Sequence, residues 1–371
     1  MRIFIICLCG FWLGITQAFS EDAKPPVRYA VVGLTHDHAL GFLPRALKRT
    51  DVHLAGIVEA NPDLCARYAR RFNISTNLFF ASLDDLLAHT NIQAVSTFTS
   101  TFEHRRVVEE CAARHIDVMM EKPLAVSMEH ARAIAAAAKK SGIRVMVNYE
   151  TTWYPAVQRS YEILNDEKAI GDLRRIVVHD GHRGPREIGC SEDFLGWLTD
   201  PVQNGGGALM DFGCYGADLI AWLNHGQRPT SVFAMTQHIK PDVYPKVEDD
   251  ATIVVTYPKS QGIIQASWNW PFDRKDMEVY GKAGYVLSPK SNIVRVRKPG
   301  GEETEEKLAA PATANVNSDQ LTYLVAVVRR EIEPSGLSSL ENNMIVTEIL
   351  CAGRESAETG KRVDLSPAQS W

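Results

Sequence analysis

Hydrophobic and polar positions divide this chain into two halves with different patterns. Over residues 27–148, short apolar runs alternate with helical patterns, which is typical of a parallel sheet covered by helices. Helix boundaries agree, since a capping residue precedes a proline at Asn61-Pro62 and an Ala-rich helix is bracketed by Ser127 and Gly142. The predicted strands are Val27–Val32, His53–Val58, Ala94–Phe98, Asp117–Met120 and Arg144–Val147.

After residue 149 the strands follow one another without helices between them. They are Leu173–His179, Thr230–Gln237, Ala251–Tyr257, Gly262–Trp268, Asp276–Tyr280 and Asn292–Arg297. This order predicts an open, mostly antiparallel sheet in a second α/β domain over residues 149–365. One helix is expected over Ala208–Leu223, two more over Ser318–Glu331 and Leu340–Glu358, and a polar loop over Pro299–Asn315.

The first residues have the three-part pattern of a secretory leader. Arg2 precedes an apolar run, Ile3–Ile15, and small residues follow at Thr16–Ala18. The run is shorter than the roughly 20 residues that a spanning helix needs. We expect a signal peptide over residues 1–18, cleaved after Ala18 or Ser20, export to the periplasm or the medium, and no stable membrane insertion after processing.

Composition narrows the class further. With 45% hydrophobic and 23% charged residues the chain is an ordinary globular protein. The 40 Lys and Arg against 45 Asp and Glu leave a net charge of −5, so no basic excess is available to bind nucleic acid. The cysteines beyond the leader are scattered, with no C-x-x-C pair, which argues against a disulfide scaffold or a zinc ribbon.

The end of the first strand has part of a dinucleotide-binding pattern. Gly33 supplies the first glycine of a G-x-G-x-x-G turn, but Thr35 and His38 stand at the second and third glycine positions. Glu59 closes the next strand, where a carboxylate accepts hydrogen bonds from ribose hydroxyls and repels a 2'-phosphate. The pattern favours NAD over NADP, although a structural turn and a solvated strand-end charge would look the same.

Two further motifs make the chain similar to a known family. They are Ala94-Val95 with Thr99, His104 and Glu121-Lys122-Pro123, and Gly205-Gly206-Gly207-Ala208-Leu209-Met210-Asp211 with Gly213, Tyr215 and Asp218. Their combination resembles the Gfo/Idh/MocA oxidoreductases. The resemblance implies an N-terminal Rossmann domain, a C-terminal open sheet, nicotinamide between them, a cis Lys-Pro bond, and a dimer or tetramer. The cofactor-binding set it implies is Gly33, Thr35, His36, His38, Glu59, Thr99, Ser100, His104, Glu121 and Lys122.

The same resemblance directs attention to three groups for proton transfer: Lys122, Asp211 and Tyr215. Hydride removal from a secondary alcohol needs a group that takes the hydroxyl proton. We assign Tyr215 as that acceptor, because a neighbouring ammonium would favour the ionised phenol, with Lys122 as polariser and Asp211 binding a second hydroxyl. The reverse assignment, with Asp211 as base, stays open. Spacing of i, i+4 and i+7 places Asp211, Tyr215 and Asp218 on one helix face.

Candidate substrate contacts lie in two loops. Trp153 would stack on a sugar, and His182 and Arg183 would donate hydrogen bonds to it; packing between domains is the alternative role for Trp153. His179 and His182 lack a third ligand at suitable spacing, so we predict no metal site.

Together these features predict an exported, NAD-dependent oxidoreductase that acts on a secondary hydroxyl of a sugar, glycoside or cyclitol. Because free NAD is scarce outside the cytoplasm, we expect the cofactor to be held tightly. Two alternatives stay open: a redox-neutral glycosidase or lyase that uses retained NAD through a 3-keto intermediate, and a non-catalytic sugar-binding protein on a Rossmann scaffold.

Overall fold

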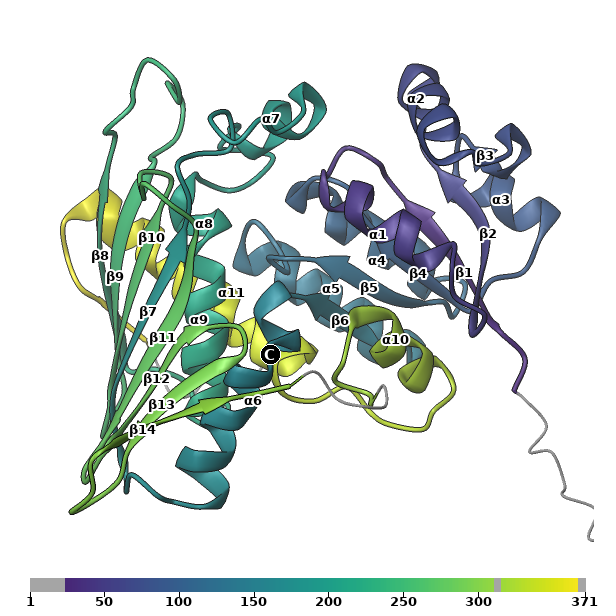
Figure 1. The fold of residues 1–371 in the computed structure, drawn as a ribbon. Coiled ribbons are helices and arrows are strands. Elements are labelled where there is room, and N and C mark those ends of the chain that lie inside the picture. The colour runs from purple at the N-terminus through teal and green to yellow at the C-terminus, as the bar shows by residue number, and fades with distance from the viewer. Residues whose placement is uncertain (1–23, 310–314, 366–371) are drawn as a thin grey trace, which may run out of the picture.

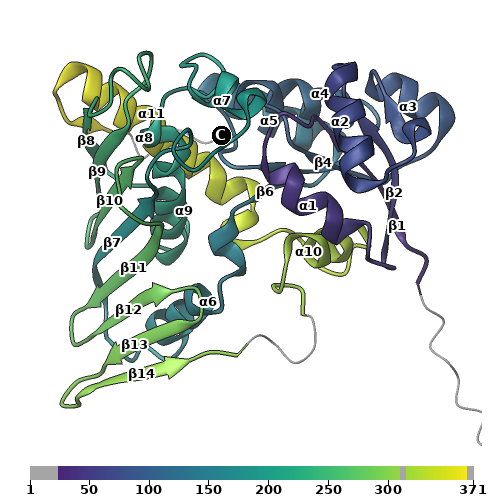
Figure 2. The same ribbon diagram turned by 45° about the horizontal axis from the view of Figure 1, so that its top comes forward.

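The computed structural model describes residues 24–309 and 315–365, and within them two sheets lie side by side, each with its own helices (Figures 1 and 2). The predicted leader, residues 1–18, lies outside the described residues. Among the helices that are described, none has both the length and the apolar character needed to cross a bilayer.

The first sheet is wholly parallel and has six strands in the order β3-β2-β1-β4-β5-β6. Its strands are β1 (Val27–Val32), β2 (Val52–Val58), β3 (Phe79–Phe80), β4 (Ala94–Thr97), β5 (Asp117–Glu121) and β6 (Val145–Asn148). Its helices are α1 (His38–Ala46), α2 (Pro62–Phe72), α3 (Leu83–His89), α4 (His104–Ala112) and α5 (Met128–Ser141). The order reverses between β1 and β4, so ligands are expected at the carboxyl ends of these two strands. The predicted parallel α/β fold of this half is confirmed.

Helix boundaries in this half follow the capping residues. Asn61 accepts hydrogen bonds from the N–H groups of Asp63 and Leu64 at the start of α2. Ser127 caps α5 in the same way, and Gly142 ends it in the left-handed conformation.

The second sheet has nine strands in the order β14-β13-β12-β11-β7-β10-β9-β8-β15. Neighbouring strands are antiparallel except β7 and β10, so the prediction of a mostly antiparallel sheet is confirmed. The strands are β7 (Leu173–Gly181), β8 (Ser231–Gln237), β9 (Asp250–Thr256), β10 (Gln261–Ser267), β11 (Arg274–Gly281), β12 (Tyr285–Lys290), β13 (Ile293–Arg297), β14 (Glu303–Lys307) and β15 (Val363–Asp364).

One strand corrects the prediction of a polar loop over Pro299–Asn315. β14 lies inside that range and pairs with β13, although its five side chains are all polar and mostly exposed. Its backbone bonds hold it at the sheet edge, where a charged strand is tolerated because no core face has to be filled.

The helices after residue 149 are α6 (Pro155–Tyr161), α7 (Glu192–Leu198), α8 (Ala208–Asp211), α9 (Gly213–Leu223), α10 (Gln320–Val328) and α11 (Leu340–Thr359). Of these, α10 packs on the first sheet. Single 3-10 turns occur at Thr76–Leu78, Thr101–Glu103, Glu150–Trp153 and Gly336–Ser338, and a π turn at Glu162–Asp166. The single helix predicted over Ala208–Leu223 is divided at Phe212 into α8 and α9.

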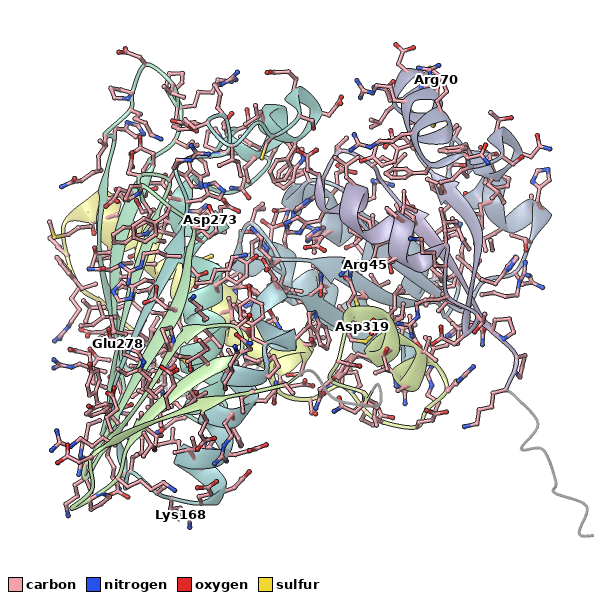
Figure 3. All side chains as sticks on the ribbon, in the orientation of Figure 1. Arg45, Arg70, Lys168, Asp273, Glu278 and Asp319 are labelled. Atoms are coloured by element: carbon pink, nitrogen blue, oxygen red, sulfur yellow. The ribbon has the colours of Figure 1, made fainter. Side chains whose placement is uncertain are left out.

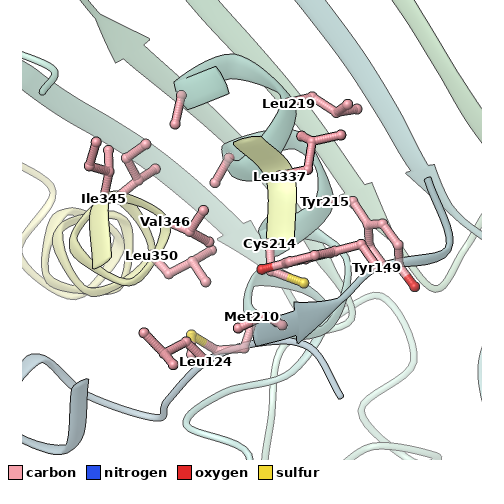
Figure 4. Packing of buried hydrophobic residues seen from close by; sticks show 14 of the residues in the cluster. Leu124, Tyr149, Met210, Cys214, Tyr215, Leu219, Leu337, Ile345, Val346 and Leu350 are labelled. Carbon is pink, nitrogen blue, oxygen red and sulfur yellow. The ribbon is translucent and has the colours of Figure 1, made fainter. Parts of the chain in front are cut away.

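One hydrophobic cluster crosses the junction between the two halves. Met210, Cys214 and Tyr215 from α8 and α9 pack with Leu124 and Tyr149 of the first half (Figure 4). Met210 and Tyr215, which belong to the second family motif, therefore lie on a buried interface between the two halves.

Candidate functional site

The turn after β1 is built around a glycine that no other residue could replace without strain. Gly33 has φ +80°, and a Cβ there would lie 2.5 Å from Thr99 Cγ2 and 3.0 Å from the backbone of Phe98. The turn therefore lies directly against the segment that follows β4. Such close approach is what the first glycine of a dinucleotide-binding turn provides.

Glu59 is held at the carboxyl end of β2 by backbone donors. Its Oε2 accepts the N–H of Leu34 at 2.9 Å, and its Oε1 accepts the N–H of Asn61 at 2.9 Å. The carboxylate lines the first cleft, so it is positioned as a hydrogen-bond acceptor for a ligand there.

The first cleft has a volume of about 420 Å³ and runs across the carboxyl ends of β1, β2 and β4. Of the predicted cofactor residues, Gly33, Thr35, Glu59, Thr99 and Ser100 line it. The sequence prediction missed the rest of its polar and aromatic lining, which includes Asp84, Glu103, Arg106, Asp193, Trp197 and Gln203.

The turn after β1, which we call the altered turn, has Thr35 and His38 where a dinucleotide-binding turn usually has glycines. The imidazole Nδ1 of His36 accepts the N–H of His38, which is the first N–H of α1. Among the described hydrogen bonds, none uses the N–H of Thr35 or Asp37. Of the two residues, Thr35 lines the first cleft, and its N–H is available as a donor to the pyrophosphate of a dinucleotide.

His36 and His104 are not part of the lining of the first cleft. His36 is 1% exposed and its ring packs against Phe194 and Trp197, with centroids 4.6 and 5.4 Å away. His104 is equally buried, and its Nδ1 donates to the carbonyl of Pro123 at 3.1 Å. Burial lowers the pKa of His36 well below its ordinary value and that of His104 to about 4, so both rings are neutral at pH 7.

A second cleft of about 450 Å³ is lined by His38 and Asp37 at the start of α1. His38 Nδ1 lies 2.9 Å from Glu121 Oε2, and Asn148 Nδ2 donates to Glu121 Oε1 at 2.8 Å. Trp153 and Glu150 form part of this cleft, as do Arg45 of α1 and Asp319 before α10, labelled in Figure 3. The second cleft therefore ends at Glu121, next in the chain to Lys122.

Lys122 and Asp211 form a buried ion pair at the domain junction. Lys122 follows β5, and its peptide bond to Pro123 is cis, as the family resemblance implies. Its Nζ donates to the backbone carbonyl of Asp211 at 3.0 Å and forms an ion pair with Asp211 Oδ1. The indole N–H of Trp268 donates to Asp211 Oδ2 at 2.9 Å.

The two charges of this pair stabilise each other against burial. Burial opposes the ammonium of Lys122, but the carboxylate of Asp211 outweighs it, and the pKa of Lys122 is raised. Burial would likewise raise the pKa of Asp211, but Lys122 outweighs it, and the pKa of Asp211 is lowered. At neutral pH the pair is therefore an ammonium and a carboxylate.

The expected lowering of the Tyr215 pKa is wrong. Burial raises this pKa well above 10, and nearby acidic groups, Glu150 foremost, raise it further. The two ammonium groups near this residue lie over its ring, with Lys122 Nζ 5.3 Å and Lys275 Nζ 4.9 Å from the centroid. They therefore interact with the π face and do not stabilise a phenolate. Tyr215 stays close to the pair as a neutral phenol.

The predicted single helix face for Asp211, Tyr215 and Asp218 is interrupted, because Asp211 lies on α8 whereas Tyr215 and Asp218 lie three positions apart on α9. Asp218 is fully buried, and Asn342 Nδ2 of α11 donates to its Oδ1 at 2.6 Å. The break at Phe212 ends the continuous helical spacing on which that prediction rested. Asp218 is a structural link between α9 and α11.

The predicted substrate residues separate in the structure. Trp153 lines the second cleft, its N–H donates to Asn148 Oδ1 at 2.9 Å, and its ring packs against Tyr323 of α10. His182 lies edge-on to Phe212 with ring centroids 4.8 Å apart, close to Asp211. Arg183 is exposed and lines neither cleft.

Asp180 is a buried acid that the sequence reasoning missed. It is fully buried on β7, and within the described residues neither carboxyl oxygen has a hydrogen-bond partner. Burial raises its pKa well above the ordinary value, although Lys275 on the paired strand opposes this. The signal was available in the strand pattern, because Ile176 and Val178 occupy the preceding inward positions.

Three side chains have ligand atoms within 4.8 Å of one another: His36, His38 and Glu121. The Nδ1 atom of His36 is bonded to a backbone N–H, and that of His38 lies against Glu121. The Nε2 atom of His36 is buried and has no hydrogen-bond partner among the described residues. Because the Nδ1 atom of His38 and the carboxylate of Glu121 already bind each other, we assign no metal here, and the predicted absence of a metal site stays a prediction.

Comparison with family models gives two matches. Residues 27–149 match an oxidoreductase family with an NAD-binding Rossmann fold, and residues 157–287 match the GFO/IDH/MocA C-terminal domain. Together the two matches cover more than half of the chain.

Among curated proteins, the chain is similar to trans-1,2-dihydrobenzene-1,2-diol dehydrogenases. The Sus scrofa protein is 25% identical over 224 residues, which are 60% of this chain and 61% of that protein. The Xenopus laevis protein is 27% identical over 199 residues, 53% of this chain and 54% of that protein. The match thus spans less than two thirds of the length of these relatives.

Solved structures share the fold over nearly the whole chain. Aldose-aldose oxidoreductase from Caulobacter crescentus, complexed with glycerol, aligns with a TM-score of 0.77 and 23% identity, covering 92% of this chain and all of that one. An inositol dehydrogenase homologue from Azotobacter vinelandii, complexed with NAD+, aligns with a TM-score of 0.79 and 18% identity, covering 92% and 98%. At these identities the likeness establishes the fold alone.

Proposed function

This chain belongs to the Gfo/Idh/MocA family of NAD-binding oxidoreductases, and from that premise we propose that it oxidises a secondary hydroxyl of a sugar, glycoside or cyclitol. The observation that carries the proposal is the buried Lys122–Asp211 pair. It lies beside Glu121 at the carboxyl end of β5, where the family's nicotinamide is expected.

Bound NAD supplies the hydride acceptor. The chain's own residues manage the proton. The Asp211 carboxylate takes the hydroxyl proton, because it is the group of the three candidates that is both ionised and able to accept. The Lys122 ammonium donates hydrogen bonds that polarise the reacting oxygen and hold Asp211 in place. Tyr215, neutral and packed against Tyr149, orients the substrate and excludes water.

The second cleft supports a polyhydroxylated substrate. It offers the carboxylates of Glu121 and Glu150, the amide of Asn148, and the indole of Trp153. Carboxylates and amides accept or donate to several hydroxyls at once, and an indole face covers the apolar side of a sugar ring. This lining supports the proposed chemical class of substrate, and so do the relatives' names, with a diol and an inositol among them.

We extend the proposal to an exported enzyme that keeps its NAD through turnover. The support is the leader pattern of residues 1–18 together with the scarcity of free NAD outside the cytoplasm. A retained cofactor has to be reoxidised in place. This requirement supports, as a second candidate function, a redox-neutral glycosidase or lyase in which the reduced cofactor would return its hydride to a 3-keto intermediate.

The proposal is tested by following deuterium from substrate to cofactor. Holoprotein is incubated with sugars, glycosides and cyclitols deuterated at the carbinol carbons, and the nicotinamide is analysed by mass spectrometry. We expect label in the nicotinamide for the wild type and for Lys139→Met, an exposed control on α5, and none for Lys122→Met.

The same assay separates the alternatives. Label that enters the nicotinamide transiently and leaves with an eliminated product indicates the redox-neutral reaction. Binding of sugars with no label transfer for any substrate would contradict the oxidoreductase proposal and favour the non-catalytic alternative.

A further inference from the structure

Residues 190–204 of the second half of the chain cross the first cleft, and we call them the strap. The strap contains α7, which lies beside the first sheet's helices at the top of the molecule in Figure 2. Three of its side chains, Asp193, Trp197 and Gln203, line the cleft. The dinucleotide-binding surface is thus completed by a segment that lies outside the Rossmann sequence.

One end of the strap is fastened to the altered turn. Asp37 accepts two hydrogen bonds from Ser191, one from its N–H at 2.8 Å and one from its Oγ at 2.6 Å. The same Oγ accepts the N–H of Phe194 and so caps α7. Asp193 forms an ion pair with Arg67 of α2, the helix that follows Glu59.

The middle of the strap covers the turn itself. The indole N–H of Trp197 donates to the carbonyl of Thr35 at 3.3 Å. The ring of His36 packs against Phe194 and Trp197. Three consecutive residues of the turn after β1, Thr35 to Asp37, are therefore each in contact with the strap.

The other end is fastened to the opposite wall of the cleft. The N–H of Phe102 donates to the carbonyl of Gln203 at 2.9 Å, and Ser100 Oγ donates to Gln203 Oε1 at 2.9 Å. Thr101 Oγ1 donates to Asn204 Oδ1 at 3.2 Å. The strap is anchored on both walls, after β1 and after β4.

We propose that the strap retains the dinucleotide, so that NAD leaves only when residues 190–204 detach and its release is slower than turnover. Asp193, Trp197 and Gln203 become cofactor-positioning residues under this proposal. It rests on the proposed function in that it explains how an exported enzyme keeps its NAD. Contacts from the second half of the chain compensate for the close backbone approach to the pyrophosphate that the missing glycines would have allowed.

The test measures the rate of NAD release without any sugar present. Protein loaded with NAD is freed of excess cofactor and chased with a large excess of ADP-ribose, and released NAD is measured over time. Asp37→Ala removes both bonds to Ser191, Ser191→Ala removes one, and Trp197→Phe removes the bond to Thr35. Ser127→Ala is the matched control, because Ser127 caps α5 as Ser191 caps α7 but lies outside the strap.

We expect wild type and Ser127→Ala to release NAD more slowly than one turnover. Asp37→Ala should release it at least tenfold faster, and Ser191→Ala and Trp197→Phe severalfold faster. Equal rates for all strap variants and the wild type, or wild-type release faster than turnover, overturn the proposal.

A second measurement does not depend on the folding of any variant. Hydrogen exchange of the wild-type strap amides should slow when NAD binds, and exchange that NAD leaves unchanged contradicts the proposal. The outcomes also separate the two proposals. A protein that retains NAD but transfers no hydride overturns the proposed function alone, and one that oxidises sugars with freely exchanging NAD overturns the strap alone.

Discussion

The two ends of the cofactor site are built in different ways. At the reaction end, the Lys122–Asp211 pair is buried and its groups come from two short motifs that stand out in the sequence. At the cofactor end, the motif is incomplete, and the turn is held by partly exposed hydrogen bonds from the strap. The reacting side chains are thus carried by short motifs, whereas the contacts that support the cofactor turn come from residues distant in the sequence. An incomplete glycine motif therefore does not by itself indicate that the cofactor is lost.

The largest effect is expected at the reaction end, for Lys122→Met. Losing the polarising group should lower kcat by at least about a hundredfold. The buried Asp211 carboxylate would also lose its partner, which should cost about 3–5 kcal/mol of unfolding free energy. Urea unfolding and deuterium transfer measure the two effects.

A double variant controls for the unpaired charge. Lys122→Met with Asp211→Leu should recover much of the unfolding free energy and none of the activity. If Lys122→Met alone unfolds at the wild-type urea concentration, the pair is not the buried ion pair described here.

Asp180→Asn extends the comparison to a buried acid whose carboxyl oxygens have no hydrogen-bond partner among the described residues. The folded-state pKa of Asp180 is raised, so the native protein binds this proton more tightly than the unfolded chain does. Its contribution to stability is complete below the ordinary Asp pKa of about 3.9 and is lost as the pH rises through the raised value.

Because Asn does not titrate, the variant should gain stability over the wild type by up to about 1.4 kcal/mol per pH unit in that window. Urea unfolding between pH 4 and 8 measures the difference. Charged neighbours that face the group are Lys122, Glu150, Lys275 and Asp276. A difference that is constant with pH would mean that Asp180 ionises normally.

Gly33→Ala examines the cofactor end in isolation. The left-handed φ of +80° and the 2.5 Å approach to Thr99 Cγ2 should together cost about 1–3 kcal/mol and weaken NAD binding. Gly142→Ala is the matched control, because it has φ +72° but nothing within 4 Å of the added Cβ. Thermal unfolding should show the larger loss at position 33, and equal losses at both positions would remove the steric argument for the turn.

Glu59→Gln should give the smallest effect. Replacing the carboxylate weakens the acceptor for the ribose hydroxyls, and we expect NAD affinity to fall about tenfold, which is 1.4 kcal/mol. Affinity for NADP should fall less, because the repulsion of a 2'-phosphate is removed as well. Calorimetric titration with both dinucleotides measures the ratio, and an unchanged preference for NAD would locate the discrimination elsewhere in the first cleft.

The sequence predicted the fold well because its signals are local. Strand periodicity placed five of the six strands of the first sheet, and the capping residues at Asn61 and Ser127 placed two of its helices. Strands β3, β12, β14 and β15 were missed. β14 has five polar residues and forms only because β13 offers it a backbone edge.

The site was predictable as far as its motifs extend. Lys122 and Asp211 were named from short patterns and meet in the structure, whereas the contact of Ser191 with Asp37 joins residues far apart in the chain and leaves no periodic signal. The pKa of Tyr215 was misjudged because it depends on burial and on which part of the ring faces each ammonium. Residue spacing in the sequence predicts neither of these.

Helix α10 sets the order in which the protein can fold. Leu321, Tyr323 and Leu324 fill the core of the first sheet, and Arg330 pairs with Asp117 of β5, although more than three hundred residues precede them. Helices α1 and α2 pack in the same cluster and precede α10 in the chain, so α10 is the last helix of this cluster to leave the ribosome. The core of the N-terminal domain is therefore completed only after most of the second sheet has been synthesised.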